Sequence, residues 1–235
     1  MVMAEATNHY FKHLGVSDGL SQVCIPSIYQ DELGAVWLGT TEGLNRYNGK
    51  DVRVFQPSES NHGLTNNEIN ELCGDKNGRM YIRSGNDLIK LDIYTEQFTC
   101  LRQKGVYGLF CKKDTLWVSC ADGIYYYTGQ GTELTFFARV QKGFVGRALY
   151  VDRETVWVVT RKYLVAISRE DPLRQEILLT LDKGNCILGD SSGNIWVGAW
   201  NGLYRVSPDR ETTAYVSHSG MGELSDNQVR CVLED

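Results

Sequence analysis

The sequence lacks long apolar runs and any strong excess of one charge sign. No stretch of about 18 apolar residues occurs, so no membrane-spanning helix is predicted. There are 24 Lys and Arg residues against 29 Asp and Glu residues, and no basic run. This balance does not fit a nucleic-acid-binding surface or a polybasic patch for anionic lipid. We therefore predict no nucleic-acid partner and no direct contact with a membrane.

Recognisable cysteine motifs and a leader sequence are also missing. Residues Met1–Thr7 have neither a charged segment nor an apolar core, so this chain shows no signal peptide. The seven cysteines form no Cys-x-x-Cys pair and no zinc-like Cys/His cluster. Several lie in apolar runs, where cysteine acts as a small hydrophobic residue. Composition alone favours a reducing compartment, and it leaves open whether the cysteines are free.

A repeated pattern fills most of the chain. Each of five segments contains a strand, a polar turn, a strand that starts near an aromatic residue, a short turn and a third strand. The repeat length is about 40 residues, which is typical of β-propeller blades. We predict that the aromatic residues form the core between blades; they are Trp37, Tyr81, Trp117, Trp157 and Trp196.

The turns have a chemical explanation. The first turn of three segments starts with Asp and ends with Gly: Asp31 to Gly34, Asp75 to Gly78 and Asp190 to Gly193. Aspartate can accept hydrogen bonds from the backbone of such a turn, and glycine tolerates a positive φ. These turns superficially resemble calcium loops, but the further ligands of a calcium loop are missing. We predict turn chemistry here and no metal site.

We predict an all-β fold: a β-propeller of four-stranded blades. The expected blades cover approximately residues 20–56, 64–102, 103–138, 139–182 and 183–217. Residues 221–235 would begin a further blade, and residues 10–14 would form an outer strand that closes the ring. Because the sixth unit stops after one strand and would leave an unpaired edge, we expect an incomplete part of a larger propeller.

Specific residues carry a resemblance to a known repeat. Gly19–Ser21, Ile28–Asp31, Trp37–Thr40 and Glu42–Tyr47 resemble the two-component regulator propeller repeat, and the fifth segment matches it at Asp190, Gly193, Ile195–Gly198 and Asn201–Arg205. The second segment has Tyr81 in place of Trp. The third has a shorter first turn, and the fourth lacks both turn glycines.

This resemblance implies a function. Proteins with this repeat have seven-bladed propellers, commonly two in tandem, in the periplasmic sensors of Bacteroides-type hybrid two-component systems. The sensors resemble those that detect oligosaccharides, and a histidine kinase follows in the same protein. We therefore expect a periplasmic ligand-sensing fragment without catalysis of its own or a cofactor. Kinase motifs are absent from this chain, so kinase activity would belong to the longer parent protein.

The topology of a blade predicts where a ligand binds. Turns between second and third strands lie on the same face as the loops that enter the inner strands, and ligands usually bind to this face. The polar and aromatic residues expected there are Thr41, Glu42, Asn86, Asp87, Asp122, Arg161, Lys162, Trp200 and Asn201. Trp200 is the strongest candidate because it departs from the core pattern of the other tryptophans. Arg161 and Lys162 could contact an acidic glycan or simply be solvated.

Two other functions remain open. The chain could be a scaffold for protein–protein interaction or dimerisation, since incomplete propellers expose blade edges that favour self-association. It could also be an enzyme similar to streptogramin lyase, which needs a histidine base and a metal-binding carboxylate. The four histidines, His9, His13, His62 and His218, lie near the N-terminus or between blades, and none recurs at an inner position. We therefore expect no catalytic residue.

Overall fold

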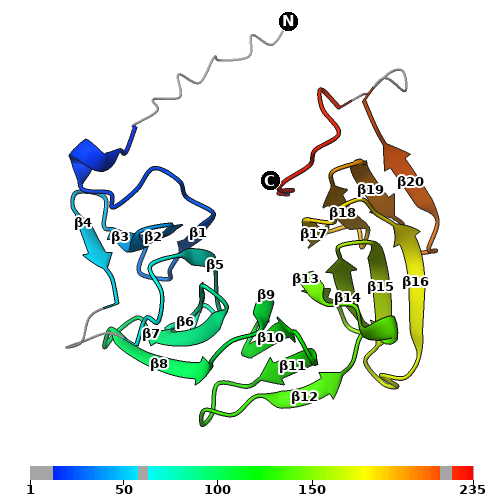
Figure 1. Cartoon of the computed structure of the whole chain (residues 1–235), viewed down its shortest axis with the longest axis horizontal. Helices are drawn as coiled ribbons and strands as arrows, with labels where there is room; N and C mark the ends of the chain where they lie inside the picture. Colours follow the sequence, from blue (N-terminus) through cyan, green and yellow to red (C-terminus); the bar gives the residue numbers. More distant parts are fainter. Residues whose placement is uncertain (1–12, 58–62, 218–223, 235) are drawn as a thin grey trace, which may run out of the picture.

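The computed structural model describes residues 13–57, 63–217 and 224–234. These residues form five four-stranded antiparallel sheets, arranged side by side in an arc (Figure 1). The predicted all-β propeller fold of four-stranded blades is confirmed. No described helix is long and apolar enough to cross a membrane.

Each sheet follows chain order from its inner to its outer strand. Blade 1 contains β1 (Ser27–Gln30), β2 (Val36–Thr40), β3 (Gly43–Tyr47) and β4 (Val52–Phe55). Blade 2 contains β5 (Ile69–Gly74), β6 (Arg79–Ser84), β7 (Asp87–Asp92) and β8 (Gln97–Arg102). Blade 3 contains β9 (Val106–Lys112), β10 (Thr115–Cys120), β11 (Gly123–Tyr127) and β12 (Thr135–Ala138).

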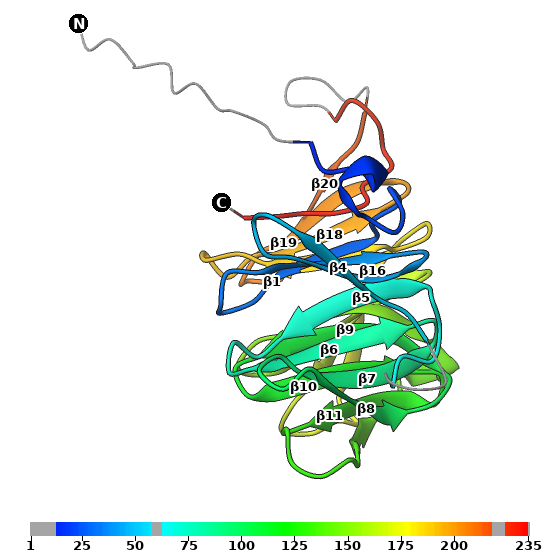
Figure 2. The same ribbon diagram turned by 90° about the vertical axis from the view of Figure 1, so that its left-hand side faces the viewer.

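The remaining two blades have the same order. Blade 4 contains β13 (Gly146–Val151), β14 (Thr155–Thr160), β15 (Tyr163–Ser168) and β16 (Gln175–Thr180). Blade 5 contains β17 (Cys186–Gly189), β18 (Ile195–Ala199), β19 (Gly202–Val206) and β20 (Thr212–Tyr215). Two short 3-10 helices, η1 (Val16–Asp18) and η2 (Gln141–Gly143), lie in the connections before blades 1 and 4. Figure 2 shows the blades stacked face against face.

The hydrophobic core lies between neighbouring blades. Trp37 of blade 1 is fully buried and packs with Ile69, Met80 and Ile82 of blade 2. Tyr81, Trp117 and Trp157 are also buried, each in a cluster that includes residues of the following blade.

Trp196 is the exception among the five aromatic residues. It is only half-buried, because no further sheet packs on this side of blade 5 among the described residues. Its ring stacks on Tyr215 of its own blade, with centroids 5.8 Å apart.

The turn aspartates bond both the backbone and the core tryptophan. In blade 1, Asp31 Oδ1 accepts the backbone N–H of Leu33 and Ala35, and Oδ2 accepts Trp37 Nε1–H at 2.8 Å. Corresponding bonds join Trp157 Nε1 to Asp152 at 2.6 Å and Trp196 Nε1 to Asp190 at 2.8 Å. The aspartate therefore fixes the turn and the orientation of the indole together.

The two predicted end segments contain no described strand. Residues 10–12 of the expected closing strand lie outside the described residues, and His13 and Leu14 are not in a strand. Residues 224–234 are also without a strand, but they run along blade 5. Val229 N donates to Ala199 O at 2.9 Å, and Asn185 Nδ2 donates to Val229 O at 3.1 Å.

Candidate ligand-binding face

The turns between second and third strands are hydrogen-bonded to the loops that enter the inner strands, either of the same blade or of the next one. The Ala121 N–H, beside the β10–β11 turn, donates to Gly105 O at 2.8 Å, just before β9. Gly43 N donates to Asn67 O at 2.7 Å, which joins the blade 1 turn to the loop before β5. Turns and entry loops therefore share one face of the arc, and we refer to it as the hairpin face.

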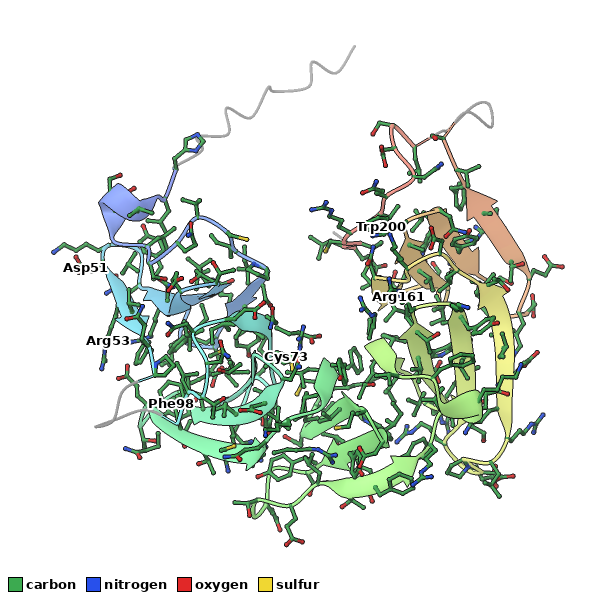
Figure 3. All side chains as sticks on the ribbon, viewed as in Figure 1. Asp51, Arg53, Cys73, Phe98, Arg161 and Trp200 are labelled. Atoms are coloured by element: carbon green, nitrogen blue, oxygen red, sulfur yellow. The ribbon has the colours of Figure 1, made fainter. Side chains whose placement is uncertain are left out.

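One entry loop brings the turns of blades 4 and 5 together. Leu181 N donates to Lys162 O at 2.7 Å, and Gly184 N donates to Arg161 O at 3.3 Å. The same loop accepts a hydrogen bond from the next turn, from Trp200 N to Asp182 O at 2.9 Å. Figure 3 shows Arg161 and Trp200 on these two neighbouring blades.

Trp200 has an exposed indole with a cation above it. The side chain is 39% exposed. Lys183 Nζ lies 3.5 Å from the ring centroid, a cation–π contact. Lys183 was not among the predicted residues. Its place in an entry loop was a usable signal, since entry loops and hairpin turns share one face. Its backbone has a φ of 47°, unusual for a residue other than glycine.

The group on blades 4 and 5 is chemically mixed. Arg161 and Lys162 are exposed, and neither side chain has a hydrogen bond or ion pair to a described residue. Asn201 is partly used by the fold, because its Oδ1 accepts the Asp182 N–H at 3.0 Å. An aromatic surface, two free cations and an amide can bind a sugar ring and an attached anionic group.

The other predicted residues lie at the corresponding turns of blades 1, 2 and 3. Thr41 is half-buried in blade 1, and Glu42 is exposed. Asn86 is exposed in blade 2, where its carbonyl oxygen accepts the Val106 N–H at 3.0 Å.

The loop before β5 joins the turns of blades 1 and 2 in the same way, since Gly43 N donates to Asn67 O and Gly85 N donates to Glu68 O, both at 2.7 Å. The turns of blades 4 and 5 differ in combining an exposed indole with two cations.

Asp87 and Asp122 are already used by the fold. Asp87 Oδ1 accepts the Lys104 N–H. Asp122 accepts hydrogen bonds from Arg102 at 2.8 Å and from Tyr125 at 2.9 Å. Desolvation opposes ionisation of Asp122, but these two bonds outweigh it and lower the pKa of its carboxyl.

A cavity also lies away from the hairpin face. It has a volume of about 760 Å³ and lies at the opposite turns of blades 4 and 5, where Arg153, Arg169 and Arg174 contribute to its lining. Arg169 donates to the carbonyl oxygens of Asp152 and Arg153, both at 3.0 Å. Arg210, which also lines the cavity, is paired with Glu176 at 2.5 Å. We favour the hairpin face because it also presents the exposed indole of Trp200.

Among the described residues, no group of three or more His, Cys, Asp and Glu side chains is placed to hold a metal ion. His13 is exposed near the start of the described chain, and the other three histidines lie outside the described residues.

Comparisons with known proteins agree with this architecture. The family described as "Two component regulator propeller" matches residues 19–42. Over 53 residues the chain is 38% identical to histidine kinase P4 of Formosa agariphila, covering 23% of this chain and 4% of that protein. The extracellular domain of a protein described as a hybrid two component system from B. thetaiotaomicron superimposes with a TM-score of 0.75 at 22% identity.

The structural match covers 92% of this chain and 33% of that extracellular domain. The chain thus spans about a third of the first structure and a small part of the curated relative. Virginiamycin B lyase from Staphylococcus aureus has the same fold at 11% identity, with a TM-score of 0.64 and coverage of 83% of this chain and 71% of the lyase. The fold alone therefore does not separate sensors from enzymes.

The repeat predicted from Gly19–Ser21 and Trp37–Thr40 is confirmed by the family match. Residues 19–42 thus match the two-component regulator propeller family, and the chain has the same fold as the extracellular domain of the B. thetaiotaomicron protein.

Proposed function

We propose that this chain is a periplasmic ligand-sensing part of a hybrid two-component histidine kinase, that it binds an oligosaccharide, and that it has no catalytic activity of its own. This proposal rests mainly on one group of side chains that an entry loop brings together on the hairpin face: Trp200, Lys183, Arg161 and Lys162. Structures similar to this chain support the sensory role, since one of them is the extracellular domain of a protein described as such a system.

The chemistry of the group narrows the ligand class. An exposed indole can stack on the apolar face of a sugar ring. The free side chains of Arg161 and Lys162 favour a sugar that carries carboxylate or sulfate groups, because charge-assisted hydrogen bonds are the strong ones. The proposed ligand is therefore an acidic oligosaccharide.

Signalling would require a difference in affinity. A bound ligand can shift a receptor between kinase-on and kinase-off states only if it binds them unequally. The affinity for the ligand can be measured on whole receptors that are locked in the kinase-on or the kinase-off state. Equal affinities of the two locked receptors would exclude this mechanism.

Isothermal titration of the purified chain tests binding. A panel of neutral oligosaccharides and of uronic-acid and sulfated oligosaccharides of equal length is titrated into the chain. We expect heat only with acidic members, and a loss of affinity of at least tenfold in Trp200→Ala, equal to about 1.4 kcal/mol.

The matched control is Tyr94→Ala. Tyr94 is 62% exposed and follows the third strand of blade 2, at the face opposite the hairpin turns. Its removal should leave the affinity unchanged. An equal loss of affinity in both variants, or binding that Trp200→Ala and Arg161→Ala leave intact, would contradict the proposed site.

A further inference from the structure

The inner strands of successive blades share a common register. Tyr29, Cys73 and Tyr150 each lie opposite the core aromatic residue of their own blade, across the first strand pair. These three residues therefore occupy equivalent positions. Their side chains are on the strand face that is directed toward the following blade, as are the core aromatic residues.

Each of these residues faces a position on the inner strand of the next blade. That position comes one residue after the one that lies opposite the core aromatic residue of the next blade. Gly74 of β5, Cys111 of β9 and Gly189 of β17 each lie opposite the residue just before the core aromatic residue. These three positions are also equivalent to one another.

At two interfaces a tyrosine packs directly on a glycine. A Cβ atom added to Gly74 would lie 2.2 Å from Tyr29 Oη, and one added to Gly189 would lie 2.1 Å from Tyr150 Cζ. The side chain at the first position thus points at the backbone of the second, so closely that only glycine fits beside tyrosine there.

The interface between blades 2 and 3 has a cysteine at both positions. Cys73 occupies the place of the tyrosine and Cys111 that of the glycine. Both are half-buried and pack on the same cluster, which includes Leu109 and Leu116. The strands β5 and β9 lie side by side (Figure 2), and Cys73 lies on the inner part of blade 2 (Figure 3). The neighbouring Cys111 side chain raises the pKa of the Cys73 thiol.

We propose that Cys73 and Cys111 form a disulfide that links blade 2 to blade 3 when the chain meets a disulfide-bearing oxidant, either a thiol oxidoreductase or a small disulfide. Both are free thiols in the structure. Such a bond requires the Cβ atoms of the two residues to face each other across adjacent segments. The Tyr–Gly contacts at the equivalent positions show that the first side chain points across the interface at the second position, and we infer the same direction for Cys73 toward Cys111.

The order of the two exchange steps follows from the surroundings of each sulfur. Interaction with Cys111 and then burial hold the pKa of the Cys73 thiol well above its ordinary value, so Cys73 is a poor first nucleophile. The Cys111 thiolate attacks the oxidant, forms a mixed disulfide and releases one thiolate. Cys73 then loses its proton to solvent and attacks the Cys111 sulfur, which releases the second thiolate. Two cysteine thiols are oxidised and one oxidant disulfide is reduced to two thiols.

The bond would close a loop that contains the outer strands of blade 2. It would restrict the unfolded chain and prevent the two inner strands from separating. The oxidised chain should therefore unfold at a higher temperature than the reduced chain. This inference does not depend on the ligand or on the proposed binding site.

The experiment uses the folded chain and oxidised glutathione. After incubation, free thiols are alkylated and the peptides are mapped without reduction by mass spectrometry. We expect a peptide pair joined through Cys73 and Cys111, lighter by two hydrogen atoms than the sum of its parts, and a rise in Tm that dithiothreitol reverses. Cys111→Ser should lose both, whereas Cys100→Ser, also half-buried in a strand, should keep both.

Several results would overturn the proposal. A glutathione adduct that persists on Cys111 while Cys73 stays a free thiol would show that the geometry does not allow closure. So would alkylation of both residues after full oxidation of an exposed thiol such as Cys24. Peptide mapping of the unsubstituted chain gives this answer even if Cys111→Ser does not fold.

Discussion

Blades 1 and 2 have different aromatic residues at the same core position, and these residues differ in their hydrogen bonding. In blade 1, Trp37 is fully buried and its indole N–H is bonded to Asp31. In blade 2, Tyr81 takes that position and is also fully buried, but its hydroxyl has no hydrogen-bond partner among the described residues. Asp75, the counterpart of Asp31, is bonded to the Arg79 guanidinium instead.

The difference shows what the repeated aspartate does. In both blades one carboxylate oxygen accepts backbone N–H groups of the turn, at 2.9 and 3.0 Å in blade 1 and 2.8 and 3.2 Å in blade 2. The other oxygen accepts whichever donor the second strand supplies. Asp31 and Trp37 are therefore one coupled unit, and when tryptophan is lost an arginine satisfies the carboxylate.

The largest expected effect comes from breaking this unit in blade 1. Asp31→Ala removes two carboxylate oxygens that accept three hydrogen bonds at a site that is 4% exposed, and it leaves the Trp37 N–H buried without a partner. We expect a loss of about 3 kcal/mol in the free energy of unfolding. Urea unfolding followed by tryptophan fluorescence measures it.

Two further variants sharpen the result. Asp31→Asn keeps an acceptor for the turn but presents N–H groups to the indole, so it should be intermediate. Asp114→Ala, in the shortened turn of blade 3, should change little because that side chain is 68% exposed. Equal losses in Asp31→Ala and Asp114→Ala would show that the aspartate acts only through general turn propensity.

These contrasts show which features the sequence could predict. Strands and turns were predictable because alternation and Asp–Gly turns are local signals, as at Asp31 and Gly34. The bond from Asp31 to Trp37 was not predicted, although the spacing was visible, because turn chemistry accounts for only one carboxylate oxygen. The Lys183–Trp200 and Cys73–Cys111 contacts depend on how one blade is placed against another segment, and no short-range pattern encodes that placement.

A second comparison predicts a pH effect in blade 2. Ser27 of blade 1 and Glu71 of blade 2 occupy equivalent register positions. Burial raises the pKa of Glu71 to about 7, although Arg83 at 3.3 Å opposes the shift. Because the folded state holds this proton more tightly, stability should fall as the pH rises from about 4.5 to about 7, by about 2 kcal/mol.

Glu71→Gln should remove that part of the pH dependence, since an amide does not titrate in this range. Glu68→Gln, at a nearby exposed position, should leave it intact. Urea midpoints at several pH values measure both. If the slope between these pH values survives in Glu71→Gln, another group causes it.

Removing the hydroxyl of Tyr81 tests the comparison of blades 1 and 2 with a smaller expected change in stability. Tyr81 and Tyr127 are in edge-to-face contact, with centroids 6.0 Å apart, but Tyr127 Oη donates to Gly131 O at 2.7 Å. Tyr81→Phe should be neutral or stabilising by up to about 1 kcal/mol, whereas Tyr127→Phe should destabilise by about 1 kcal/mol. Thermal unfolding of the two variants gives the sign. A loss of stability in Tyr81→Phe would mean that its hydroxyl is satisfied in solution.

The smallest effect is expected where the molecule is most exposed. Trp37 is fully buried, whereas Trp200 is 39% exposed and has Lys183 above its ring. Lys183→Ala should therefore cost only about 0.5 kcal/mol of stability, as expected for an exposed cation–π pair. A double-mutant cycle with Trp200→Ala isolates the pair. A coupling as large as the effect of Asp31→Ala would mean that Trp200 is a structural anchor like Trp37, which would weaken its assignment to the ligand-binding face.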